Sequence, residues 1–146
     1  MPPEKMIGYC GNNCHHCGAR SDDPVIRQKV VDGWKKFLHL EMYTAENIKC
    51  DGCRSDGKLA DTQCKIRPCV TVKKLPGCGY CDDLTSCKKI ERFIMHRYGF
   101  FLYGQKMLPP MTEEEYRLCI RQFDSLKNLT FQMVDAGKLP AWLKKY

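Results

Sequence analysis

The chain has 146 residues, of which 43% are hydrophobic and 28% charged, and its formal net charge is +7. These values exclude an intrinsically disordered chain and fit one domain of ordinary size. No stretch approaches the roughly 20 apolar residues of a membrane span, and the first residues lack the apolar core of a signal peptide. We therefore expect a cytoplasmic protein without a membrane anchor.

Eleven cysteines dominate the composition. In a reducing cytoplasm dense cysteines are more often metal ligands than disulfides, and an odd number argues against a closed disulfide framework. Two sites of four thiolates, each on a divalent ion, would lower the net charge from +7 to +3. Because most of the basic surplus is then cancelled and the basic residues are dispersed over helix faces, we do not expect nucleic-acid binding.

Residues 8–18 contain the first ligand set, Cys10, Cys14 and Cys17. A zinc ion or a simple cluster is the preferred occupant. The spacing also fits the iron–sulfur site of radical enzymes that use S-adenosylmethionine, but this chain is short for their barrel and shows no βα alternation. His15 and His16 lie between the ligands, and each either completes a site or is a solvated loop residue.

A helix is predicted over residues 24–40. Asp22 and Asp23 suit its N-cap, and Pro24 suits its first position. The apolar residues then recur at helical spacing, and we interpret them as a core-facing stripe: Ile26, Val30, Trp34, Phe37 and Leu38. The lysines of this helix, Lys29, Lys35 and Lys36, are interpreted as its solvated face.

Two pairs of cysteines have the form of zinc knuckles, with two residues between the thiols and a glycine inside. They are Cys50 with Cys53 and Cys78 with Cys81. This spacing lets both sulfurs bind one tetrahedral ion. Gly52 and Gly79 are expected to take a positive φ, which turns backbone N–H groups toward the sulfurs.

Three further cysteines lie near these knuckles. Cys64 and Cys69 are separated by four residues, and Pro68 predicts a helix over residues 68–74, although the β-branched residues 70–72 could equally be extended. Cys87 is predicted in the first turns of a helix over about residues 83–98, as a ligand or as a packed core thiol.

The part of the chain after residue 98 is no longer rich in cysteine. Residues 99–104 form an apolar loop, and Thr112 with Glu115 forms a capping box. The helix that follows is predicted to bury Tyr116, Cys119, Ile120, Phe123 and Leu126, which makes Cys119 structural. A last helix is expected from about Thr130 to Gly137.

These motifs together resemble the bacterial and archaeal family called domain of unknown function 3795. The resemblance covers roughly residues 7–95 and rests on the cysteine motifs at residues 9–17, 48–53, 64–69, 78–81 and 87, with the helix that contains Trp34. It implies a small cytosolic cysteine-rich protein, presumed to bind metal, with no established reaction. Where many relatives carry a further cysteine, this chain has residues 61–63.

The expected fold is mainly α: an irregular cysteine-rich module over residues 1–98, stapled by metal, with zinc knuckles packed on a few helices. A helical extension over residues 99–146 packs on it. The ten expected ligands are Cys10, Cys14, Cys17, Cys50, Cys53, Cys64, Cys69, Cys78, Cys81 and Cys87. The preferred pairing joins Cys50 and Cys53 to Cys78 and Cys81. The residue 10–17 set then forms another site, completed by Cys64, Cys69 or Cys87.

Zinc is the expected metal, with an iron–sulfur cluster as the alternative, since all-thiolate sites accept both. The sequence shows no phosphate loop, nucleophile elbow or paired acid and base. We therefore expect a non-catalytic protein whose zinc sites support an interaction or regulatory surface, with a protein partner contacting residues 100–103. The alternative is an enzyme or electron carrier that uses the triplet Cys10, Cys14 and Cys17.

Overall fold

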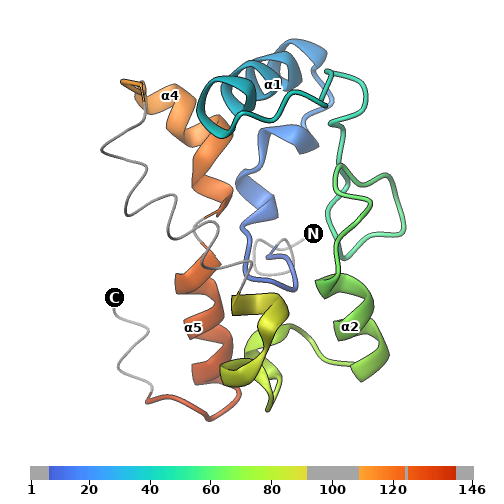
Figure 1. The fold of residues 1–146 in the computed structure, drawn as a ribbon, viewed down its shortest axis with the longest axis vertical. Helices are drawn as coiled ribbons and strands as arrows, with labels where there is room; N and C mark the ends of the chain where they lie inside the picture. Colours follow the sequence, from blue (N-terminus) through green and yellow to red (C-terminus); the bar gives the residue numbers. More distant parts are fainter. Residues whose placement is uncertain (1–6, 92–108, 124, 141–146) are drawn as a thin grey trace.

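A computed structural model describes residues 7–91, 109–123 and 125–140 (Figure 1). Its α-helices are α1 (Pro24–Leu38), α2 (Ile66–Lys73), α4 (Glu113–Glu115) and α5 (Ser125–Asp135). In Figure 1, α1 and α4 lie at one end of the molecule and α2 and α5 at the other, with the N-terminal segment between them. The only β-pairing among these described residues is an isolated bridge between Ile7 and Asn13. The mainly α prediction is confirmed.

Helix α1 begins and ends as its sequence predicts, to within two residues. The Asp23 carboxylate accepts a hydrogen bond of 2.9 Å from the Val25 N–H, and Pro24 occupies the first turn. The helix ends at Leu38 because His39 takes a left-handed conformation with φ 56°. The lysines of the outer face are exposed and form ion pairs with glutamates, Lys29 with Glu114 and Lys36 with Glu115.

The largest core cluster surrounds Trp34 on the inner face of α1. Its ring packs against Tyr43 and Phe123, with centroid distances of 5.2 and 5.6 Å. The indole N–H donates a hydrogen bond of 2.8 Å to the carbonyl oxygen of Cys119. The Cys119 side chain is 1% exposed, and burial raises the pKa of its thiol to about 12. The structural role predicted for this cysteine agrees with its surroundings.

The segment after Thr112 is less regular than predicted. The capping box is present, with the Thr112 hydroxyl accepting from the Glu115 N–H at 3.1 Å and the Glu115 carboxylate from the Thr112 N–H at 3.0 Å. A π-helical turn (Tyr116–Ile120) and a 3₁₀ turn (Arg121–Phe123) then follow α4 instead of one continuous helix. Tyr116 is 39% exposed, so its predicted burial is wrong.

The remaining helices differ from prediction mainly at their ends. Helix α2 begins at Ile66 and includes residues 70–72, which are therefore helical and not extended. Helix α5 begins at Ser125, earlier than predicted. The helix predicted over 83–98 is replaced at its start by a 3₁₀ turn (Leu84–Ser86) and an extended Cys87, and helical residues begin at 88 and continue to 91, the last described residue of this segment. Residues 92–98, the apolar loop 99–104 and the side chain of Leu126 lie outside the described part of the chain.

None of the described helices is long and apolar enough to cross a membrane.

Candidate functional site

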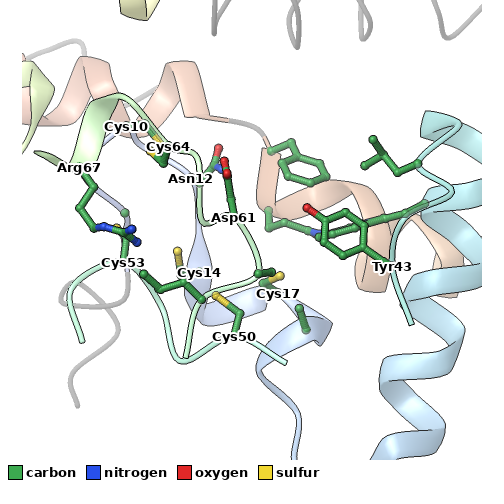
Figure 2. Close-up of a pocket in the computed structure, with 18 residues that line it drawn as sticks. Cys10, Asn12, Cys14, Cys17, Tyr43, Cys50, Cys53, Asp61, Cys64 and Arg67 are labelled. Carbon is green, nitrogen blue, oxygen red and sulfur yellow. The ribbon is translucent and has the colours of Figure 1, made fainter. Parts of the chain in front are cut away.

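Four thiols form what we call the first thiol group: Cys14, Cys17, Cys50 and Cys53. All four line one cavity (Figure 2). Cys14 begins a 3₁₀ turn (Cys14–His16), and the N–H of Cys17 closes it by donating to the Cys14 carbonyl at 3.2 Å. On the other side, Gly52 takes a φ of 91°, as predicted, and this bends the chain between Cys50 and Cys53. Two C-x-x-C segments therefore meet at one place.

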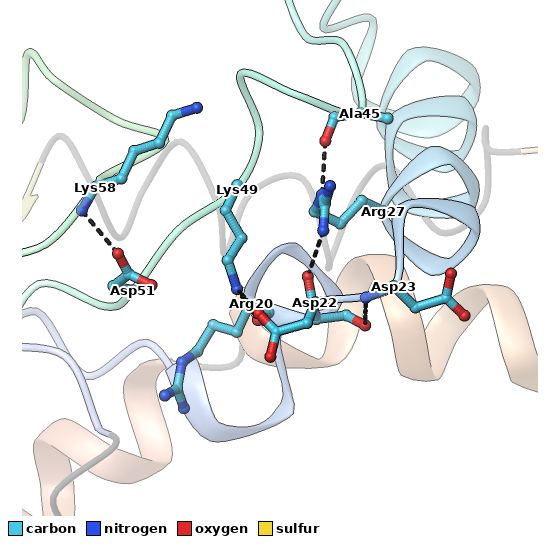
Figure 3. Close-up of polar contacts among 9 residues, drawn as sticks. Arg20, Asp22, Asp23, Arg27, Ala45, Lys49, Asp51 and Lys58 are labelled. Atoms are coloured by element: carbon cyan, nitrogen blue, oxygen red, sulfur yellow. Dashed lines mark hydrogen bonds and ion pairs between the residues drawn. The ribbon is translucent and has the colours of Figure 1, made fainter.

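Direct hydrogen bonds hold the two segments together. The Cys50 N–H donates to the Ala19 carbonyl at 3.0 Å. Next to it, the Lys49 ammonium group donates to the Arg20 carbonyl at 2.6 Å and pairs with Asp22 at 2.8 Å (Figure 3). The bond from Lys49 and its charge lower the pKa of the Asp22 carboxyl.

Two further contacts shape the loop around Cys50. The Arg27 guanidinium reaches from α1 to the Ala45 carbonyl at 2.6 Å (Figure 3). The loop after Cys50 is closed by Asp51, whose N–H donates to the Lys58 carbonyl at 2.7 Å and whose carboxylate accepts from the Lys58 N–H at 2.8 Å. The backbone that carries Cys50 is thus fixed from both sides.

The electrostatics of the first thiol group favour a thiolate at Cys53. Its hydrogen bond with Cys14 lowers the pKa of Cys53 to about 6, and the same bond, followed by burial, raises the pKa of Cys14. The Tyr9 N–H also donates to the Cys53 sulfur at 3.4 Å. Gly8 leaves room for this approach, since a Cβ there would lie 3.3 Å from the Cys53 sulfur.

Five thiols form the second thiol group: Cys10, Cys69, Cys78, Cys81 and Cys87. Cys78 lies at its centre and is 6% exposed. Burial raises the pKa of Cys78 to about 12, and the negative charges of the other four thiols act in the same direction. Cys64 packs against the same core cluster and, with Cys10, also lines the cavity of the first thiol group.

The second thiol group uses the same local geometry as the first. Cys78 begins a 3₁₀ turn (Cys78–Tyr80), and the Cys81 N–H donates to the Cys78 carbonyl at 3.1 Å. The Cys78 N–H donates in turn to the Tyr9 carbonyl at 2.9 Å. Lys73 places its ammonium group 3.4 Å from the Cys81 sulfur and 2.8 Å from the Asp83 carboxylate.

Gly79 serves a different purpose from the one predicted. Its φ is not in the left-handed region, unlike that of Gly52. Instead its backbone approaches α5, where the Gly79 N–H donates a hydrogen bond of 2.9 Å to the Gln132 side chain. A Cβ on Gly79 would lie 2.9 Å from the Leu129 carbonyl oxygen and closer still to the Gln132 Cβ.

The described contacts group the knuckles differently from the preferred pairing, which stays a prediction. Cys53 lies against Cys14 and not against the second knuckle, while the thiols around Cys78 come from residues 10, 69, 81 and 87. Cys10 lies near both groups, and its charge therefore raises the pKa of Cys14 and of Cys78. Within the described residues, no group of three or more His, Cys, Asp or Glu side chains has an arrangement ready to hold an ion.

The three described histidines lie outside both thiol groups. His15 and His16 are exposed, and their rings meet edge to face at 5.0 Å. The Nδ1 atom of His16 contacts the Arg121 guanidinium, and burial followed by the charge of Arg121 lowers the pKa of His16. His39 ends α1 on the surface, and His96 lies outside the described residues.

Arg54 joins the two thiol groups and was not singled out by its sequence pattern. Its Nε donates to the Ile7 carbonyl and its Nη2 to the Pro76 carbonyl, both at 2.6 Å. The guanidinium also lies 4.4 Å from the centre of the Tyr9 ring. It follows Cys53 directly and reaches the loop that leads to Cys78, so it fixes one knuckle relative to the other.

We expect Arg54→Ala to lower the free energy of unfolding by about 2 kcal/mol, because two hydrogen bonds and a cation–π contact are lost. Arg54→Lys should recover little of the lost stability, since an ammonium group cannot donate the same pair of hydrogen bonds in a planar fork. Urea titration followed by circular dichroism measures the change. Lys88→Ala is the control, because its exposed pair with Glu91 contributes less than about 1 kcal/mol. Equal effects at both positions would contradict the bridging role.

Residues 6–92 match the family described as "Protein of unknown function (DUF3795)". Neither a curated protein nor a solved structure gives a match to the chain.

Proposed function

Because the chain belongs to the DUF3795 family of proteins of unknown function, whose description names no reaction, we propose its function from the two thiol groups. We propose that it is a zinc-binding protein whose thiolate sites are structural and support a surface for interaction or regulation. The observation that carries this proposal is the convergence of two C-x-x-C segments in the first thiol group.

The donor atoms of the first thiol group are of the kind that zinc prefers. Zinc in structural sites takes four ligands, and four cysteines from two turns are a common way to supply them. The backbone N–H of Tyr9 at the Cys53 sulfur is the type of bond that orients a ligating thiolate. Cys14, Cys17, Cys50 and Cys53 would hold the ion. The bound ion would cross-link the segment before α1 to the segment after it.

The second thiol group supports a second metal site and one alternative. Its five thiols, with Cys64 adjoining, exceed the four that a single tetrahedral ion takes. A bridged cluster or an iron–sulfur cluster uses such a set more fully. We therefore assign the iron–sulfur alternative to this group and no longer to the triplet Cys10, Cys14 and Cys17, whose last two members lie in the first thiol group.

Metal content of protein purified without oxygen tests both proposals. We expect zinc in the wild type, and we expect Cys14→Ser and Cys50→Ser to lose the same single equivalent. Cys78→Ser should lose a different equivalent and keep the first. Cys119→Ala is the matched control, because this buried thiol belongs to neither group, and it should retain all metal.

The outcomes separate the alternatives. Iron with acid-labile sulfide that is lost in Cys78→Ser alone would establish the cluster. Loss of one common ion in Cys50→Ser and Cys78→Ser would restore the pairing expected from the sequence. Wild-type protein without any bound metal would reject the proposed function.

A further inference from the structure

A second cleft lies at helix α5, apart from the cavity of the first thiol group. Helix α5 and the turn Cys78–Tyr80 lie side by side (Figure 1), and residues of both line this cleft together with Arg54. Its volume is about 420 Å³, which lies within the range of roughly 300–1,000 Å³ of small-molecule sites. None of its lining residues is a cysteine, so the proposed metal sites do not fill it.

Two hydrogen-bond donors at this cleft are open to solvent. Arg54 donates its Nε and Nη2 atoms to the carbonyls of Ile7 and Pro76, which line the same cleft, so the guanidinium forms part of the cleft wall. The Gln132 Oε1 accepts from the Gly79 N–H, and that bond fixes Nε2 as the other end of the amide. Within the described residues, Arg54 Nη1 and Gln132 Nε2 form no hydrogen bond, and neither atom is buried.

Two acceptors line the same cleft. Asn128 donates its Nδ2 atom to the Gly11 carbonyl at 2.8 Å, which fixes Oδ1 as the end of the amide that solvent reaches. Asp135 is exposed, and a carboxylate accepts from several donors at once, so it can bind a ligand beside the contacts it already has. The cleft therefore combines a cation and an amide donor with an anion and an amide acceptor.

These groups define the chemistry of a ligand. A carboxylate matches the guanidinium and the amide donor, and an ammonium group matches the two acceptors. The rings of Tyr80 and Phe131, with Ile7 and Pro76, line the cleft with apolar surface for an aromatic group. A phosphate dianion is disfavoured, because Arg54 is the only cation in the lining and the carboxylate of Asp135 opposes a second negative charge.

We propose that this cleft binds a free α-amino acid with an aromatic side chain. The ligand carboxylate accepts from Arg54 and Gln132. Its ammonium group donates to Asn128 and Asp135, and its ring packs against Tyr80. This inference goes beyond the proposed function, because the cleft uses none of the thiols that are assigned to metal.

L-Phenylalanine is the probe, titrated by calorimetry into protein that keeps its metal as purified. We expect saturable heat. 3-Phenylpropionate, which lacks the ammonium group, and phenethylamine, which lacks the carboxylate, should each bind weaker by roughly tenfold or more, because charge-assisted hydrogen bonds are lost. Absence of heat up to millimolar phenylalanine would overturn the proposal. Tighter binding of N-acetylphenylalanine than of phenylalanine would also overturn it, in favour of the C-terminus of a peptide.

Two variants connect binding to the named groups. Gln132→Glu keeps an oxygen for the Gly79 N–H and replaces the Nε2 donor by an acceptor, so phenylalanine should bind weaker by roughly tenfold or more. Asp135→Asn should remove the preference for phenylalanine over 3-phenylpropionate, which keeps the test valid if the first variant does not fold. Asp56→Asn is the matched control, because it makes the same charge change at an exposed position outside the cleft. Equal phenylalanine affinity in all three variants would overturn the assignment.

Metal content is measured on the same samples. Phenylalanine binding by protein that contains no metal would leave this inference standing while the proposed function fails. Full metal occupancy without phenylalanine binding would have the opposite meaning.

Discussion

Treatment with a chelator under reducing conditions is expected to unfold the protein. Structural zinc contributes about 10–16 kcal/mol of apparent binding free energy in small thiolate domains, which is as large as the net stability of a whole domain, about 5–15 kcal/mol. The two core clusters are small, and thiols belong to them or pack against them: Cys78 is a member of one, and Cys17 and Cys50 pack against the other. Loss of the ions should therefore abolish the helical circular dichroism signal.

Metal replacement controls for direct effects of the chelator. Zinc added in excess, after the chelator is removed, should restore the spectrum, and reductant alone should leave it unchanged. If the metal content falls to zero while the spectrum and the thermal midpoint stay the same, the ions are not structural. The Trp34 core would then hold the fold without them.

Gly79→Ala is expected to lower the free energy of unfolding by about 3 kcal/mol, because overpacking at a rigid contact costs about this much. The added methyl group would meet the Leu129 carbonyl and the Gln132 side chain, both on α5. Since Gly79 lies in the turn that carries Cys78 and Cys81, the clash should also weaken metal binding by the second thiol group. Thermal denaturation and metal titration measure the two effects.

Gly137→Ala is the matched control. Nothing lies within 4 Å of a Cβ there, so only the strain of its φ of 75° is added, at a cost of about 1 kcal/mol. Its metal content should not change. A smaller loss of stability for Gly79→Ala than for Gly137→Ala would mean that α5 can move away from the turn.

Local chemistry made much of the fold predictable. Asp23, Pro24 and the apolar stripe define α1 almost to its last residue, and Thr112 with Glu115 defines the start of α4. These signals act within one turn of helix, so they are visible in a short stretch of sequence. The break after α4 was not predictable, because the Cys119 carbonyl accepts from Trp34, which is 85 residues away in the sequence.

The clustering of the cysteines could be predicted from the sequence, but their division into two groups could not. The described parts bring nine of the ten expected thiols into two neighbouring groups, with Cys64 beside them, but metal binding itself stays a prediction. The knuckles at Cys14, Cys50 and Cys78 have the same spacing, so spacing could not decide which two belong together. Tertiary contacts decide it: Ala19 binds the backbone of Cys50, whereas Gly79 is held by Gln132. Arg54, which joins the two groups, belongs to no recognisable motif.

The peptide groups on either side of the Tyr9 α-carbon are shared between the two centres. The N–H faces the Cys53 sulfur, and the carbonyl accepts from Cys78. An ion that shifts Cys53 would move this residue and so alter the anchor of Cys78 by a fraction of an ångström. Thermodynamic linkage makes such an effect reciprocal. Under the proposed function, an ion at one centre should then modestly raise the metal affinity of the other, so that falling free ion concentration would empty both over a similar range.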